Sequence, residues 1–547
     1  MSEITIHRAK SVVTMEPAFP SAEAVVVRDG WVLGVGSIDE LSAWGPHTID
    51  DTFADSVIFP GFVEAHAHHL EGGLWEFEYV GWFDRLGPDG VTRKGIRSVE
   101  ALIERLRELD AQMDDPTEQL VVWGLDPIYM DGERVMAHHL DAASETRPIA
   151  VFHASFHLVT VNSALMRAEG FDEGIDMPGV PAHPDGRPLG ELQEPAAMSL
   201  ARNAMLALAK AMNGPDAARR LGVLARRTGC TTLTELGGAN LANPAIREMW
   251  VEETGREGYP ARLVMFHNGG HGRYDSHAAL VDNVEAMRAE STANVRFGQV
   301  KIVLDGSIQG FTARLNPPGY LGDRPNGLWL YTPEEFRSLV LECHRRGVLL
   351  HVHCNGDEAV DLFLEVMEEG QRLHPAFDHR STVQHCQLTT PSQYRRMAAL
   401  GMSANIFANH IFYWGDQHRD ITVGPERAAR MDACRTAQRE GVRFSIHSDA
   451  AVTPLGHLHT MWCAVNRVTA SGEVLGPDER IDVESALRAV TIDAAHQLKL
   501  DHEIGSLHAG KRADMVALAE DPRAVDPMAI KDIEVNGTVV GGTVHRD

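Results

Sequence analysis

Eight short apolar runs of strand length recur along the chain and alternate with amphipathic helical stretches. Near-continuous apolar strands that alternate with helices predict a parallel sheet whose outer face the helices cover. Eight such units fit a closed (β/α)8 TIM barrel, an α/β fold, which we expect over residues 57–69 and 226–502. The runs are SVIFPGFVEAH, CTTLTEL, RLVMFHN, VKIVLDG, LLHVHCN, STVQHC, MSANIFANH and RFSIHSD.

Both ends of the chain carry further β-rich sequence outside these runs. The N-terminal strands turn at an Asp-Gly pair (29–30) and the C-terminal strands at an Asn-Gly pair (536–537), both suited to hairpins. We expect a composite β-sandwich built from residues 1–56 and 503–547. Two separate edge hairpins remain the alternative, because strand patterns alone do not show which strands pair.

The gap between the first and second apolar runs is too long for an ordinary connection between a strand and a helix. Residues 70–225 contain a helical stretch, SVEALIERLREL, and strand-like runs, QLVVWGLD and PIAVFHASFHLV. We therefore expect an inserted α/β subdomain after the first barrel strand. Loops at the carboxyl ends of barrel strands surround the catalytic mouth, so this subdomain is a candidate lid and substrate wall.

The composition limits the partners. The 547 residues include 50 Lys and Arg against 77 Asp and Glu, a formal net charge of −27, without a basic run. Nucleic acid and anionic membranes are therefore poor candidate partners, and we find neither a signal peptide nor an apolar stretch of bilayer length. Six cysteines without a C-x-x-C pair favour reduced thiols. We expect a cytoplasmic protein that acts on a small molecule, with a homo-oligomeric state left open.

The first apolar run ends in EAHAHH, in which His66 and His68 stand two positions apart. On a strand these imidazoles project from one face, whereas on a helix they would diverge by roughly 200°. The strand assignment therefore predicts a chelating pair, although H-x-H also occurs by chance in solvated loops.

Four more groups that could bind or bridge a metal fall at or near the carboxyl ends of predicted strands, where barrels assemble their chemistry. They are Lys301 in VKIVLDG, His353 in HVHCNGD, His385 in VQHC and Asp449 in HSDAAV. We expect all of them to converge with the H-x-H pair at one mouth. Imidazole and carboxylate ligands suit zinc, with manganese, cobalt or iron as alternatives.

In this order, H-x-H, Lys, His, His and Asp, the chain resembles the amidohydrolase superfamily. The segments PGFVEAHAH, HCNGDEAVD, HSDAAVTP, ALRAVTIDAAHQL and GSLHAGKRADMVAL are similar to amidohydrolase family 3, which includes N-substituted formamide deformylases. The resemblance implies one or two divalent ions. One would be held by His66, His68 and Asp449. The other would be held by His353 and His385, with a carboxylated Lys301 and a hydroxide between the two.

Lys301 lies between Val300 and Ile302, so its side chain should point into the barrel. A buried, unpaired ammonium is costly, so it either loses its proton or pairs with a carboxylate such as Asp305 or Asp449. A neutral amine can take up carbon dioxide as a carbamate, which could bridge two metals as the resemblance implies. A buried ion pair beside a single metal remains the alternative.

Three further histidines are interpreted as structural. His351 shares the face of His353 and is expected deeper in the barrel as a hydrogen-bonded core residue. His69 and His447 receive the same interpretation, although a role in supporting the metal ligands remains open for both.

The site predicts a metal-dependent hydrolase that cleaves a non-peptide C–N bond, and the resemblance implies an amide or an N-substituted formamide, which we expect to be neutral and partly aromatic. Two ions lower the pKa of a bound water and polarise a carbonyl. Asp449 is the expected catalytic base and acid, taking the proton of the metal-bound hydroxide and passing it to the departing amine. As substrate contacts we expect His157 and His410, together with Trp414 as an apolar wall.

Two other functions stay open. A mononuclear deaminase of the same fold would generally lack the lysine and carry a glutamate near His353. Glu358 stands there, but helix capping explains it as well. The second is a catalytically silent barrel with an assembly role. Such proteins usually lose ligands, whereas all six positions are filled here.

Overall fold

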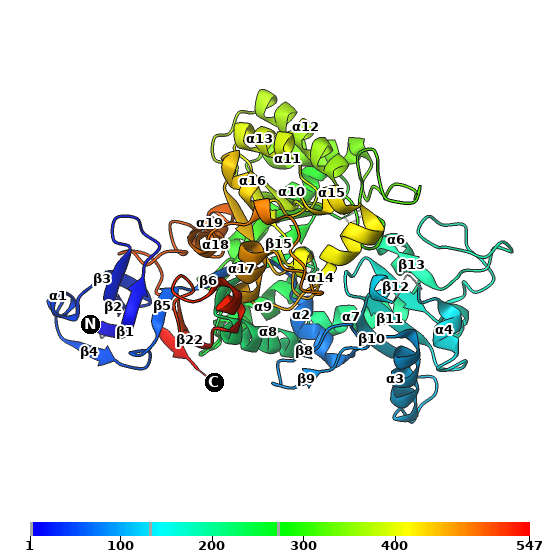
Figure 1. Ribbon diagram of the computed structural model, residues 1–547, viewed down its shortest axis with the longest axis horizontal. Helices are drawn as coiled ribbons and strands as arrows, with labels where there is room; N and C mark the ends of the chain where they lie inside the picture. Colours follow the sequence, from blue (N-terminus) through cyan, green and yellow to red (C-terminus); the bar gives the residue numbers. More distant parts are fainter. Residues whose placement is uncertain (1–3, 131–133, 271–273, 547) are drawn as a thin grey trace.

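The computed structural model describes residues 4–130, 134–270 and 274–546, and a parallel barrel of eight strands forms its centre (Figure 1). Each strand pairs with the next along the chain, and Ala67 bridges Ala450 in parallel, so the barrel nearly closes. This confirms the predicted TIM barrel. Its strands are β6 (Phe62–Ala67), β14 (Cys230–Leu236), β15 (Arg262–Asn268), β16 (Val295–Val303), β17 (Leu350–Cys354), β18 (Thr382–His385), β19 (Ser403–Ile406) and β20 (Phe444–Ile446).

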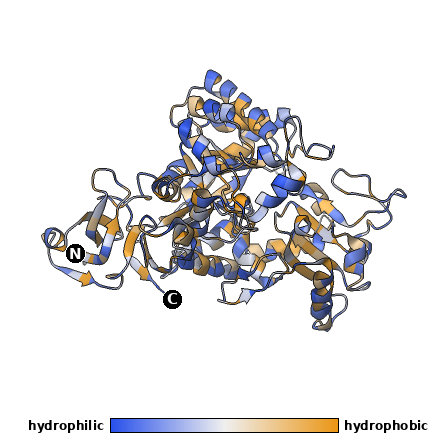
Figure 2. Ribbon diagram, viewed as in Figure 1, coloured by the Kyte–Doolittle hydropathy of each residue, from blue (hydrophilic) through white to orange (hydrophobic). Residues whose placement is uncertain are grey.

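One helix follows each barrel strand in the chain and packs on the outside. The strands are buried on both faces for this reason, while the outer helices carry many hydrophilic residues (Figure 2). The eight helices are α8 (Pro215–Thr228), α9 (Pro244–Gly255), α10 (His277–Met287), α11 (Pro333–Arg345), α12 (Asp357–Leu373), α13 (Pro391–Leu400), α16 (Cys434–Arg439) and α18 (Val483–Ala489). None of the helices in the described ranges combines the length and the apolar character that a bilayer span requires.

Strands from both ends of the chain form one eight-stranded sheet beside the barrel. The antiparallel pair of β5 with β21 joins the two ends, which excludes two separate hairpins. The sheet curls back on itself, so that β3 meets the segment before β21. Val32 donates its backbone N–H to the Lys511 carbonyl and accepts from the Gly510 N–H, both at 2.9 Å. Its strands are β1 (Ile4–Val13), β2 (Ser21–Arg28), β3 (Trp31–Gly36), β4 (His47–Asp50), β5 (Val57–Pro60), β21 (Met515–Leu518), β22 (Val535–Val540) and β23 (Thr543–His545).

The first apolar run of the sequence is two strands, not one. It divides at Gly61, where a Cβ atom would lie 2.0 Å from the Thr231 hydroxyl oxygen, so only glycine fits. The segment before Gly61 is β5, which belongs to the terminal sheet, and the segment after it is β6. The barrel therefore begins at Phe62 rather than at the predicted residue 57.

The inserted subdomain carries a mixed sheet of five strands in the order β13-β12-β11-β10-β7. It ends earlier than the predicted residue 225, because α8 packs Leu221 and Leu224 into the barrel's apolar core and serves as the first barrel helix. The strands are β7 (Glu78–Tyr79), β10 (Leu120–Leu125), β11 (Ile149–His153), β12 (Leu158–Val161) and β13 (Glu191–Gln193). The helices are α3 (Val99–Ala111), α4 (Ala137–Asp141), α5 (Ser163–Glu169), α6 (Glu194–Met198) and α7 (Arg202–Met212).

A buried ion pair joins the barrel to the terminal sheet. The Arg262 guanidinium donates from Nε and Nη2 to the two oxygens of Asp514, at 2.7 and 3.1 Å. Removing one partner of a buried pair leaves an uncompensated charge, at a cost of about 3–5 kcal/mol. We expect Asp514→Ala to lower the thermal unfolding midpoint by several degrees in scanning calorimetry. Asp185→Ala, which removes an exposed pair with Arg187, should barely change the midpoint. Equal midpoints for the two variants would contradict a stabilising role for the buried pair.

Candidate metal centre

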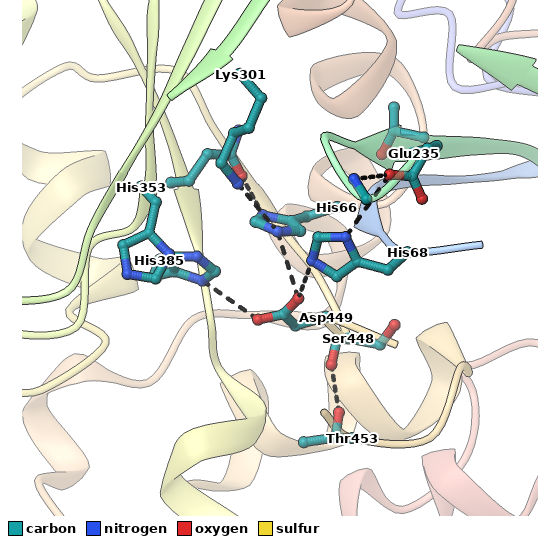
Figure 3. Close-up of polar contacts among 12 residues, drawn as sticks. His66, His68, Glu235, Lys301, His353, His385, Ser448, Asp449 and Thr453 are labelled. Carbon is teal, nitrogen blue, oxygen red and sulfur yellow. Dashed lines mark hydrogen bonds and ion pairs between the residues drawn. The ribbon is translucent and has the colours of Figure 1, made fainter. Parts of the chain in front are cut away.

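The six predicted ligands lie at one end of the barrel (Figure 3). Each comes from the carboxyl end of its strand or from the residues just beyond it: His66 and His68 from β6, Lys301 from β16, His353 from β17, His385 from β18 and Asp449 from the segment after β20. Parallel strands bring these ends to the same rim, so residues far apart in the sequence become neighbours.

Asp449 lies at the centre of the group. One carboxylate oxygen, Oδ1, is 3.3 Å from His66 Nε2 and 3.4 Å from His68 Nε2, and Oδ2 is 3.6 Å from His385 Nδ1. The ligand atoms of His66, His68 and Asp449 all lie within 4.8 Å of one another. Among the described residues, Asp449 Oδ1 and both ring nitrogens of His385 have no hydrogen-bond partner. Buried lone pairs without partners are costly, and a cation bound between them would satisfy them.

His447 belongs to the same cluster, which corrects the expectation of an ordinary core residue. Its ring stacks on His66, with centroids 4.7 Å apart and an interplanar angle of 17°. Ligand atoms of His66, His385 and His447 lie within 4.8 Å of one another, and neither ring nitrogen of His447 has a hydrogen-bond partner among the described residues. The signal was its position just beyond the carboxyl end of β20, on the rim where the predicted ligands converge.

Lys301 is buried without a carboxylate partner. Its Nζ atom lies 3.3 Å from His66 Nε2, and within the described ranges no ion pair joins it to Asp305 or Asp449. The Asp305 carboxylate instead accepts hydrogen bonds of 2.9 to 3.0 Å from three backbone N–H groups. Burial lowers the pKa of Lys301 to about 8. The ion pair that was the alternative for Lys301 is therefore not formed.

His353 lies beside the cluster rather than inside it. Its ring is 4.4 Å from that of His385, between centroids. Its Nε2 atom, however, lies 3.3 Å from the Gly306 carbonyl oxygen and 3.0 Å from the Asn355 side-chain nitrogen. These two contacts occupy His353 Nε2, whereas both ring nitrogens of His385 have no hydrogen-bond partner among the described residues.

A buried glutamine fixes the orientation of His66. The Gln384 carbonyl oxygen accepts from His66 Nδ1 at 2.6 Å and from the Asn405 amide at 2.9 Å, while its NH2 group donates to His351 Nδ1 at 2.9 Å. His351 Nε2 then faces the Gln497 carbonyl at 3.3 Å, so His351 is the hydrogen-bonded core residue that the sequence predicts. With its proton on Nδ1, His66 presents the lone pair of Nε2 to Asp449.

We expect Gln384→Leu to weaken metal binding about 10–100-fold, because partners that hold a ligating imidazole contribute on that scale. The measurement is metal retention against a competing chelator. Gln384→Glu keeps an acceptor for His66 Nδ1 and should retain the metal better than Gln384→Leu. If the leucine variant held its metal as tightly as the wild type, the orienting role would be wrong.

Two buried glutamates support the H-x-H segment from other directions. Glu235 on β14 accepts from the backbone N–H and Nδ1 of His69, at 2.5 and 2.7 Å, and lies 3.9 Å from His68 Nδ1. Burial lowers the pKa of His68, but its contacts with Asp449 and Glu235 outweigh burial and raise it to about 9. Glu64 on β6 accepts from the His66 and Ser448 backbones and so ties β6 to the segment that carries Asp449. Burial raises the pKa of Glu64 to about 8.

The inserted subdomain brings His157 to the mouth of the barrel. The His157 ring lies 5.4 Å from that of His353, between centroids, and its Nδ1 atom is 2.7 Å from Glu194 Oε2. The other oxygen of Glu194 is buried without a hydrogen-bond partner among the described residues. Gly306 permits this approach, because a Cβ atom there would lie 2.4 Å from Glu194 Oε1. Sequence reasoning missed Glu194, which no motif marks.

His410 and Trp414 lie one layer behind the cluster, on α14 (Asn409–Gln417). His410 is buried and its Nδ1 atom lies 2.9 Å from His418 Nε2. Trp414 donates from Nε1 to Asp126 Oδ2 at 2.7 Å, which ties the inserted subdomain to the barrel. Both side chains are almost wholly covered by protein, and Phe407 separates them from the cluster in the chain of ring contacts: its ring lies 4.6 Å from that of His410 and 4.6 Å from that of His447, between centroids.

Glu358, the residue that bears on the deaminase alternative, is engaged elsewhere. Its carboxylate accepts from Arg314 Nη2 and from the Asn326 amide, both at 2.8 Å. These contacts tie the first turn of α12 to the loop that follows β16. They explain why a carboxylate stands at position 358 without assigning it a role in the metal cluster.

Comparison with known proteins matches nearly the whole chain to one protein family and to relatives covered over most of their length. The family described as "Amidohydrolase family" matches residues 54–545. The chain is 25% identical over 550 residues to Protein LONG AFTER FAR-RED 3 of Arabidopsis thaliana, covering 97% of this chain and 90% of that protein. It is 24% identical over 567 residues to an N-substituted formamide deformylase of Arthrobacter pascens, covering 100% and 99%. A solved metal-dependent hydrolase of Pyrococcus horikoshii OT3 shares the fold, with a TM-score of 0.70 and 19% identity over 96% of this chain and 99% of that one.

Proposed function

The chain belongs to the amidohydrolase family, and from that premise we propose that it is a metal-dependent hydrolase that cleaves the C–N bond of a small amide or N-substituted formamide. One observation carries the proposal: buried imidazoles surround the Asp449 carboxylate, and several of their lone pairs have no partner among the described residues. The similarity to an N-substituted formamide deformylase supports the choice of bond.

The donor set fits a divalent metal, most simply zinc. His66, His68 and Asp449 would hold one ion, and His385 would belong to a second set with His447 or, after a turn of its ring, His353. Lys301 would join as an N-carboxylated side chain, which its burial without a carboxylate partner favours. Metal ions bound there supply a nucleophilic water at neutral pH and polarise the substrate carbonyl.

The chain's own residues then move the proton and hold the substrate. Asp449 is the base that accepts the proton of the attacking water, and it returns that proton to the nitrogen of the departing amine. Its carboxylate is kept ionised, since the effect of His68 outweighs that of burial and lowers the pKa of Asp449. His157, held by Glu194 at the mouth, is positioned to donate a hydrogen bond to the substrate oxygen. The inserted subdomain, which brings His157 to the mouth, would limit the entry of bulk water there.

We also propose a cytoplasmic location, which the six free cysteines favour. The formal net charge of −27 supports the absence of a nucleic-acid or anionic-membrane partner. Trp414 and His410 support the wall behind the substrate rather than contact the reacting atoms.

Elemental analysis joined to a substrate panel tests the function. The purified protein is stripped with a chelator and reloaded with zinc, manganese or cobalt. It is then assayed on formamides, acyl amides, hydantoins and aminopyrimidines. We expect hydrolysis of formamides or acyl amides that disappears with the metal and returns on reloading. Turnover of aminopyrimidines alone would replace the proposal with a deaminase, and metal-independent turnover would reject it.

A further inference from the structure

A cavity with both polar and apolar walls lies where the inserted subdomain meets the loop that follows β16. Its volume is about 80 Å³. The subdomain contributes Asp126, Ser155 and Leu158 to its wall, and the loop contributes Gln309 and Phe311, with Arg324 at the rim. No predicted metal ligand lines it.

The cavity and the metal centre share two walls. Ser155 and Leu158 flank His157, whose ring lies beside that of His353, and the Ser155 hydroxyl accepts from the His157 backbone at 3.3 Å. The second wall is the loop after β16, in which the Gly306 carbonyl contacts His353 three residues before Gln309. A small substrate with its scissile bond at the ligand cluster would therefore reach the cavity with its other end.

Arg324 brings a positive charge without a carboxylate partner. Its guanidinium lies over the Phe311 ring, 4.1 Å from the centroid, and no ion pair or hydrogen bond is formed with any described residue. The other charged groups of the wall are already engaged: Arg134 donates to Glu191 at 3.0 Å, and Asp126 accepts from Trp414 at 2.7 Å. The unpaired charge at the rim is thus a guanidinium.

Gln309 brings a second, independent feature. It is 6% exposed and lines the cavity, yet its Oε1 atom is buried without a hydrogen-bond partner among the described residues. A buried amide without a partner carries a desolvation penalty that a bound polar ligand would remove. Because the amide can turn about its last bond, it can offer its NH2 group to an acceptor in the cavity.

From these features we propose, resting on the proposed function, that the cavity is a subsite for a carboxylate on the substrate, held by Arg324 and Gln309. The substrate class is then an anionic amide or formamide, such as an N-acylated amino acid. Leu158 and Phe311 pack against the hydrocarbon between the scissile bond and the carboxylate. A guanidinium stacked on an aromatic ring is well suited to pair with a planar carboxylate.

Two substrates that differ only in the carboxylate test the subsite. N-formylphenylalanine and N-formylphenylalanine amide are compared as substrates of the metal-loaded protein and of Arg324→Gln. We expect kcat/KM of the wild type to favour the carboxylate by about tenfold, the scale of one charged hydrogen bond. Arg324→Gln should remove this preference through KM and leave the neutral amide within about twofold. Arg372→Gln, an exposed arginine at the end of α12, is the matched control and should change neither substrate.

A binding measurement keeps the subsite testable apart from turnover. Calorimetric titration of 3-phenylpropionate and 3-phenylpropionamide into the metal-loaded protein should show tighter binding of the carboxylate, and Arg324→Gln should weaken it about tenfold. Carboxylate binding that is indifferent to Arg324→Gln, or equal kcat/KM for the two formamides, would overturn the subsite and leave the hydrolase standing. Hydrolysis of neither formamide, with carboxylate binding still dependent on Arg324, would count against the proposed function and support the subsite.

Discussion

Asp449→Asn is expected to lower kcat/KM by about 10³-fold while the barrel stays folded. Asparagine has the same shape as aspartate but cannot take up the proton of the attacking water. It also removes the negative charge that faces His66, His68 and His385 at 3.3 to 3.6 Å, so metal affinity should fall as well. Initial rates at saturating metal, together with circular dichroism of the variant, separate the loss of the base from the loss of the ion or of the fold.

Glu358→Gln is the matched control for Asp449→Asn. The Glu358 carboxylate is bound to Arg314 and Asn326, away from the cluster, so its amide should keep activity within a few-fold of the wild type. Full activity in Asp449→Asn would remove aspartate from the role of base. A large loss in Glu358→Gln with an intact fold would favour the deaminase alternative instead.

The barrel and the convergence of the ligands could be predicted because both depend on local patterns. An apolar run of strand length and an amphipathic helix identify each βα unit, and the carboxyl end of a parallel strand fixes the rim on which its last polar residue lies. His66 and Asp449 could therefore be placed together although hundreds of residues separate them. The same rule would have added His447, which was interpreted as a core residue with a supporting role left open.

The supporting contacts could not be predicted, because they join residues that no pattern relates. Gln384 and His66 are 318 positions apart and meet only because β18 and β6 face each other across the barrel. Glu194 lies in the inserted subdomain and reaches His157 through the folding of that sheet. The start of the barrel was misplaced for a similar reason: the apolar run continues through Gly61, although the chain changes sheets there.

Lys301→Met is expected to reduce kcat/KM by about 10³-fold and yet leave stability unchanged or higher. The lysine is 1% exposed and has no carboxylate partner, so a methionine of similar length removes a buried polar group rather than an ion pair. The activity falls because the methionine cannot form the carbamate that would hold two ions together, an electrostatic loss of the size seen when a transition-state donor is removed. Metal content per chain should fall in the same variant, measured by elemental analysis beside the thermal unfolding midpoint.

Labelled bicarbonate tells whether Lys301 carries the carbamate. Burial holds the pKa of Lys301 at about 8, so the neutral amine that reacts with carbon dioxide becomes the major form as the pH rises through that value. Activation of the stripped protein by metal and ¹³C-bicarbonate should therefore speed up as the pH rises through about 8, with the label found on the wild type and absent from Lys301→Met. An active wild type without label would mean that Lys301 works as an unmodified amine. A fully active Lys301→Met would reduce the residue to a packing role.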